Sequence, residues 1–251
     1  MKKYILLGLL MIVLGAGYIF NEKRTSVDLN QNANAISDND IAVVPETVSN
    51  INAATENNSI PLPGSFEIKN VPFTSQAPLF NWDALHDEAC EEASLIITKY
   101  YLSSKNLTAD LAETEIQKMV AWEINYFGSH KNLTVQETLI LAQNYYGLDN
   151  LTTKKITSLD DIKKEISQNH LVIAPTAGRL LGNPNFRSPG PVYHMLVISG
   201  YDSKGFMTQD VGTKNGRNYY YNQTILFNAI HDWNGQDDNI VSGTKNIIIV
   251  N

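Results

Sequence analysis

The chain has 251 residues, of which 43% are hydrophobic and 9% aromatic, a composition typical of one sizeable globular domain with additional segments. Its formal net charge is -7, and its lysines and arginines are scattered along the sequence. Because nucleic-acid binding needs a basic face, this charge argues against a nucleic-acid partner. Cys90 is the only cysteine, which excludes an intrachain disulfide and zinc sites built from several thiolates.

The N-terminal segment, residues 1–24, has the pattern of a membrane-targeting sequence. Two lysines precede an uncharged run from Tyr4 to Phe20, and charge resumes at Glu22. The run is short for a membrane-spanning helix and long for the core of a secretory signal, so both an uncleaved anchor and a cleaved signal peptide fit. We favour a single-pass anchor, with the rest of the chain outside the cytoplasm. Cleavage would instead give a secreted protein.

Composition then separates a linker from a folded domain. Residues 25–65 are rich in Asn, Ser, Asp, Ala and Thr, contain no aromatic residue and show no sustained apolar period, which predicts a flexible linker. From Phe66 onward, aromatic and aliphatic residues recur to the end of the chain. Residues 66–251 are therefore the predicted folded domain.

The first half of this domain has the pattern of helices. Apolar residues at spacings of three and four predict a helix that begins after Asp87, which places Cys90 in its first turn. Other helices are predicted to start at Thr108, at Thr134 with Glu137 completing a capping box, and at Ser158.

The second half has the pattern of strands, with Gly and Asn turn signals between them. The predicted strands cover residues 171–177, 192–201, 205–210 and 218–221, followed by a helix from about Thr224 and a closing strand with the sequence NIIIV. Helices followed by mostly consecutive strands indicate an α+β fold, in which an antiparallel sheet packs against a helical half.

Cys90 is the candidate nucleophile. A thiol attacks a carbonyl group as the thiolate, and the unpaired N–H groups in the first turn of a helix stabilise negative charge there. Its sequence neighbours Asp87, Glu88, Glu91 and Glu92 oppose this effect unless they point to solvent, where charges are screened. The alternative interpretation is that Cys90 is only a small buried hydrophobic residue.

His194 is the candidate base. It interrupts the apolar strand YHMLVISGY, where a polar ring needs a hydrogen-bonding partner. Asp210 ends the next predicted strand, and the short turn between the strands brings both residues to the same end of an antiparallel pair. The carboxylate can then orient the imidazole. A core histidine and an unrelated turn aspartate explain this pattern equally well.

Gln76 lies in irregular backbone upstream of Cys90, where a side-chain amide can donate to a developing oxyanion together with the Cys90 N–H. The series VPFTSQ, NWDALHDEACEEASLIITKYY, YHMLVISGYD and FMTQD resembles the papain-like cysteine peptidases related to the double-glycine leader peptidases, in the stand-alone bacterial branch of family thirty-nine. The resemblance runs from about Val71 to the C-terminus. It implies Cys90 as nucleophile, His194 as general base and acid, Asp210 as the orienting carboxylate and Gln76 in the oxyanion hole.

This resemblance implies hydrolysis of a peptide or isopeptide bond in a peptide or protein substrate, through a thioester and without a cofactor. An amidase of cell-wall peptides or a transpeptidase would use the same side chains. The sequence departs from many members of the family in having Glu91 and Glu92 where those members have Gly-Pro. The alternative function is therefore a catalytically inactive papain-like surface module that binds peptide or cell-wall material.

The remaining histidines are not expected to take part in catalysis. His86 is predicted to be a surface or loop residue, and His130, His170 and His231 are dispersed without the spacing of a metal motif, so no metal site is expected. The segment RSPGPVY leads into His194 and forms either a rim over the site or only a turn before the strand.

Overall fold

The computed structural model describes residues 61–251. The predicted anchor at residues 1–24 and the predicted linker up to residue 60 lie outside the described residues and stay predictions. No helix in residues 61–251 combines the length and the apolar character that crossing a membrane requires.

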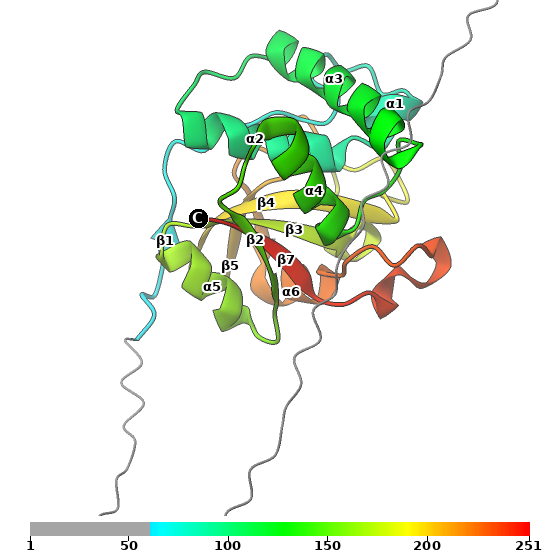
Figure 1. The fold of residues 1–251 in the computed structure, drawn as a ribbon. Helices are drawn as coiled ribbons and strands as arrows, with labels where there is room; N and C mark the ends of the chain where they lie inside the picture. The colour runs from blue at the N-terminus through cyan, green and yellow to red at the C-terminus, as the bar shows by residue number, and fades with distance from the viewer. Residues whose placement is uncertain (1–60) are drawn as a thin grey trace, which may run out of the picture. The chain divides into compact units, whose positions relative to one another are not determined.

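One antiparallel sheet of seven strands forms the centre of the described domain (Figure 1). The strands are β1 (Phe66–Glu67), β2 (Leu151–Lys155), β3 (Leu171–Ala177), β4 (Tyr193–Tyr201), β5 (Gly205–Gln209), β6 (Tyr219–Asn222) and β7 (Asn246–Val250). Their order is β2-β7-β3-β4-β5-β6, and β1 pairs with the end of β4. Every residue of β3 and β4 is buried, so both faces of the central strands are covered.

Within residues 61–251, six α-helices surround this sheet. Three of them begin directly after the capping residues that were predicted from the sequence. The helices are α1 (Ala84–Asp87), α2 (Cys90–Ser103), α3 (Ala109–Phe127), α4 (Val135–Tyr146), α5 (Leu159–Ser167) and α6 (Gln223–Ala229), with short 3-10 helices at Gly178–Leu181 and Asp237–Ser242. Thr108, Thr134 and Ser158 each accept a hydrogen bond from the first turn of the following helix. The predicted capping box between Thr134 and Glu137 is present.

The helices α2, α3 and α4 gather on one face of the sheet (Figure 1). Helix α2 packs against β4, while α3 and α4 pack against α2. Cys90 is the first residue of α2, as predicted, and this packing places it beside the start of β4. The predicted α+β class, with helices packed on an antiparallel sheet, is confirmed. The short elements β1, α1 and β2 were not predicted.

Candidate active site

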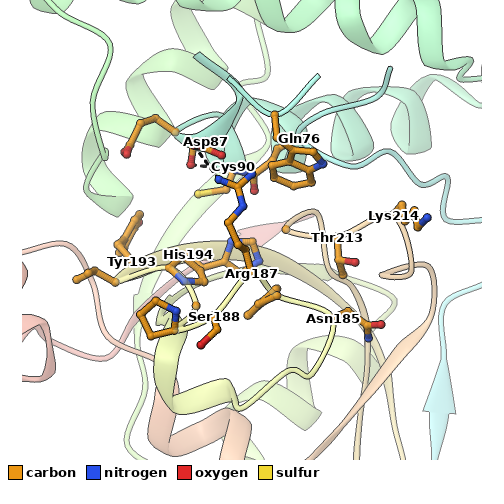
Figure 2. A pocket seen from close by; sticks show the side chains of 18 of the residues that line it. Gln76, Asp87, Cys90, Asn185, Arg187, Ser188, Tyr193, His194, Thr213 and Lys214 are labelled. Atoms are coloured by element: carbon orange, nitrogen blue, oxygen red, sulfur yellow. Dashed lines mark hydrogen bonds and ion pairs between the residues drawn. The ribbon is translucent and has the colours of Figure 1, made fainter. Parts of the chain in front are cut away.

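A pocket of about 790 Å³ brings three of the four predicted site residues together. Gln76, Cys90 and His194 all line it, with residues 185–193 and 212–215 forming much of the remaining wall. Figure 2 shows Gln76 and Cys90 on one side of this pocket and His194 facing them from β4. The fourth residue, Asp210, reaches the site through its bond to His194.

His194 and Asp210 form a fully buried pair. The Nε2 atom of His194 lies 2.8 Å from Oδ1 of Asp210, and the side chains are 1% and 0% exposed. Adjacent strands and a short turn position them, because His194 is the second residue of β4 and Asp210 follows β5 directly. With Nε2–H donating to the carboxylate, Nδ1 of the ring presents its lone pair as a base.

Asp210 is held in its ionised form by several donors. Its Oδ1 accepts the Gly212 N–H at 3.0 Å, and its Oδ2 accepts bonds from Asn183 Nδ2 and the Tyr221 hydroxyl. Burial alone would raise the pKa of this carboxyl, but the charge of His194 and the hydrogen bonds outweigh burial and lower it. The carboxylate can therefore orient His194 and stabilise an imidazolium.

The Cys90 thiol is turned away from solvent and toward Glu91. Cys90 is 3% exposed, and Sγ donates to Glu91 Oε2 at 2.9 Å and accepts the Met195 N–H at 3.3 Å. Burial and the neighbouring Glu91 carboxylate raise the pKa of the thiol well above its ordinary value. In this arrangement Cys90 carries its proton.

Two of the acidic neighbours of Cys90 do not point to solvent, so the condition under which their charges would be screened is not met. Glu91 is 0% exposed and Glu92 1% exposed, because the first turns of α2 are enclosed by β4 and the other helices. Glu91 also accepts the Leu133 N–H at 2.7 Å. Burial and the negative charge of Glu92 raise the pKa of Glu91 to about 8.

Gln76 lies in the pocket wall, but its amide is directed at the end of α1. Its Nε2 donates to the carbonyl oxygens of His86 at 2.7 Å and Asp87 at 3.1 Å. Its backbone N–H donates to Val211 O at 2.8 Å, which ties this segment to the loop after Asp210. The oxyanion-hole role of Gln76 stays a prediction.

His86 is buried, so the prediction of a surface or loop histidine is wrong. It lies in α1 with its side chain 2% exposed, and its two ring nitrogens approach Asp83 at 2.7 Å and Glu113 at 3.1 Å. Glu113 comes from α3, a tertiary contact that the local pattern does not contain. Both nitrogens are occupied, which agrees with the expectation that His86 is not the base.

The segment from Arg187 to Tyr193 lines the pocket, which confirms the interpretation as a rim. Arg187 extends across the pocket, and its guanidinium group lies 3.8 Å from the Asp87 carboxylate (Figure 2).

Sequence reasoning missed the supporting roles of Asn183 and Tyr221, which both bind Asp210. The one feature of the sequence that could have indicated Tyr221 is the aromatic run at residues 219–221, which lies on the strand beside β5.

His130 lies beside a buried carboxylate that the spacing of the histidines in the sequence does not reveal. His130 follows α3, and its Nε2 is 2.9 Å from Glu92 Oε1 on α2. Glu123 of α3 lies in the same group. The burial of Glu123 and the negative charge of Glu92 raise the pKa of the Glu123 carboxyl to about 11.

The family model described as the Peptidase_C39 like family matches residues 68–238, which is more than half of the chain. The protein belongs to this family, and the resemblance inferred from its motifs is confirmed. A crystal structure from Bacillus anthracis, described as a C39-like peptidase, is 16% identical, with a TM-score of 0.49, and the alignment covers 74% of this chain and 98% of that one. A search of curated proteins finds no significant match.

Proposed function

We propose that this protein is a cysteine peptidase that hydrolyses peptide or isopeptide bonds. Cys90 is the nucleophile, His194 the general base and acid, and Asp210 the orienting carboxylate. The observation that carries this proposal is the buried His194–Asp210 pair, which faces a pocket also lined by the first residue of α2. Family membership supports the same reaction class.

The proposed nucleophile lies beside the strand that carries the proposed base. Sγ of Cys90 lies 3.3 Å from the backbone nitrogen of Met195, the residue next to His194 on β4. In our proposal, rotation about the Cα–Cβ bond of Cys90 turns Sγ from Glu91 toward the pocket, where Nδ1 of His194 acts as the base. The described arrangement is then that of the resting enzyme.

The reaction proceeds through an acyl-enzyme. His194 takes the thiol proton while Sγ forms a bond to the substrate carbonyl carbon, giving a tetrahedral oxyanion. His194 then protonates the leaving amine as the C–N bond breaks and a thioester remains on Cys90. Water, deprotonated by the same ring, attacks the thioester and releases the carboxylic acid.

The N-terminus of α2 supplies stabilisation for the oxyanion. Its N-cap residue, Ala89, has no side-chain hydrogen bond to the helix, so the first-turn N–H groups have no side-chain acceptor there. The Cys90 N–H is the first donor in our proposal. Gln76 becomes the second donor when its amide exchanges an α1 carbonyl for the substrate oxygen.

A second candidate function is a non-catalytic peptide-binding module. The burial of the Cys90 thiol and its bond to Glu91 favour this alternative, because they hold the sulfur in its less reactive protonated form. The pocket would then bind peptide without cleaving it.

We further propose that the domain acts outside the cytoplasm on a peptide or protein substrate, with residues 1–24 as its membrane tether. The lysines, the apolar run and the following charges of that segment support this location.

The test is covalent labelling of the full-length chain, purified in mild detergent, with a peptidyl chloromethyl ketone. We expect one label by intact-mass spectrometry in the wild type, none in Cys90→Ala, and labelling slowed at least about 100-fold in His194→Ala. His170→Ala is the matched control, because His170 pairs with Glu165 on α5 and lies outside the pocket. A wild type that takes no label, or equal rates in His194→Ala and His170→Ala, would favour the binding module.

A further inference from the structure

A second group of chemistry-bearing side chains lies between α2 and α3. It consists of Glu92 from α2, Glu123 from α3 and His130 from the loop after α3. One ligand atom of each lies within 4.8 Å of the others. Glu92 is 1% and Glu123 0% exposed, and the His130 side chain is 10% exposed. None of the three is among the described residues that line the pocket.

The polar atoms of this group lack ordinary partners. Within residues 61–251, both oxygens of Glu123, Oε1 of Glu92 and Nε2 of His130 make no hydrogen bond. Nε2 of His130 is 2.9 Å from Oε1 of Glu92, yet the ring N–H is not aligned with that oxygen as a hydrogen bond requires.

Buried groups of this kind need a compensating partner. An unsatisfied buried polar group costs about 1–3 kcal/mol, and a charged one costs more, so native proteins pair nearly all of them. In the part of the chain that the structure describes, neither carboxylate forms an ion pair with a lysine or an arginine. A positive centre among the three side chains would satisfy all of the unpaired atoms together.

We propose that Glu92, Glu123 and His130 bind one divalent transition-metal cation of the Zn²⁺ or Mn²⁺ type. Imidazole nitrogen and carboxylate oxygen together favour these ions over Mg²⁺ and Ca²⁺, which prefer oxygen alone. Ligand atoms about 2.0–2.2 Å from such an ion, at angles of about 90–110°, lie about 2.8–3.6 Å from one another. The His130–Glu92 separation of 2.9 Å falls in this range. Two ligands of one ion both point at the ion, so they need not be aligned with each other as a hydrogen-bond donor and acceptor must be.

The cation would join α2, α3 and the loop after α3, and of these α2 and the loop carry residues that line the pocket. His130 is followed by Asn132, which lines the pocket, and by Leu133, whose N–H donates to Glu91. Binding would therefore fix the segment between α3 and α4 against the N-terminal turns of α2. This role is structural and independent of the reaction proposed for Cys90.

The test measures metal binding directly. The full-length chain is stripped with a chelator and titrated with Zn²⁺ or Mn²⁺ by isothermal calorimetry, in a Cys90→Ala background that removes thiolate binding. We expect one equivalent to bind, and Glu123→Gln or His130→Gln to weaken binding by more than about 10-fold, since loss of even an outer-shell partner costs 10–100-fold. Glu165→Gln is the matched control, because Glu165 pairs with His170 at 3.1 Å elsewhere, and binding should not change.

Circular dichroism is used to check that each variant is folded. If one of the two ligand variants does not fold, the other still tests the proposal. Absence of binding at millimolar Zn²⁺ and Mn²⁺ would overturn the proposal and leave a proton shared between the two carboxylates. Binding that persists unchanged in both Glu123→Gln and His130→Gln would also overturn it.

Discussion

The hydroxyl group of Tyr221 is predicted to stabilise the His194–Asp210 pair, and Tyr221→Phe removes it without changing the size of the ring. The hydroxyl donates to Asp210 Oδ2 and accepts from Asn183 Nδ2, all within the buried interior. The Asp210 charge raises the pKa of Tyr221 after the larger effect of burial, so the hydroxyl keeps its proton and remains a donor.

The expected loss follows from the charge of the acceptor. A hydrogen bond to an ionised group contributes about 1.5–3 kcal/mol, so Tyr221→Phe should lower the free energy of unfolding by about 2 kcal/mol. For a domain of this size that corresponds to a decrease in Tm of about 4–8 °C. This decrease in Tm is measured by thermal unfolding, with circular dichroism as the signal.

Tyr220→Phe is the control for this prediction. Tyr220 is the adjacent residue, 45% exposed, and its hydroxyl donates to the exposed Asp202 carboxylate at 2.6 Å. An exposed bond of this kind contributes about 0–1 kcal/mol, so Tm should change by less than about 4 °C. Equal decreases in the two variants would refute the reasoning, because burial of the acceptor would then make no difference.

Three further changes test the surroundings of the pair. Gly212→Ala places a Cβ 2.8 Å from His194 Cε1, so the ring must shift and chloromethyl ketone labelling should slow at least about 10-fold; an unchanged rate would contradict this. The pKa of Asp210 is lowered on folding, so the unfolded state binds the proton more tightly, and the stability from this carboxylate is present above about pH 4 and lost as the pH falls through the folded pKa. Acid unfolding curves should therefore be shallower for Asp210→Asn than for the wild type, and identical curves would contradict the assignment. Glu91→Gln removes the carboxylate that, after the larger effect of burial, raises the pKa of Cys90, so iodoacetamide should alkylate the thiol faster at about pH 9, above the Glu91 pKa of about 8, and an unchanged or slower rate would be inconsistent with this cause.

The helices and central strands could be predicted because their signals are local. Thr134 and Glu137 cap α4 through contacts three residues apart, and continuous apolar runs predict β3 and β4. Strand β2 gives no such signal, because only Leu151 is buried and the strand pairs solely with β7. Helix α1 has four residues, too few for an apolar period.

The site was predictable where two strands and a turn position it. His194 and Asp210 meet because they lie on adjacent antiparallel elements joined by a short turn. The surroundings of Cys90 could not be predicted in the same way, because residues 90–98 of α2 are all buried and no period distinguishes a solvent face there. The contacts of Glu91 with Leu133 and of His86 with Glu113 join distant segments and follow from packing alone.

The most direct test of a cysteine peptidase is cleavage of peptides. The full-length chain is incubated with a mixture of peptides of diverse sequence, and mass spectrometry identifies the products, with Cys90→Ala and His194→Ala measured in parallel. We predict cleavage by the wild type that falls more than about 1,000-fold in each variant, because the two residues act as one unit. Cleavage that survives in Cys90→Ala, or a wild type that cleaves nothing in the mixture, would contradict the proposed function.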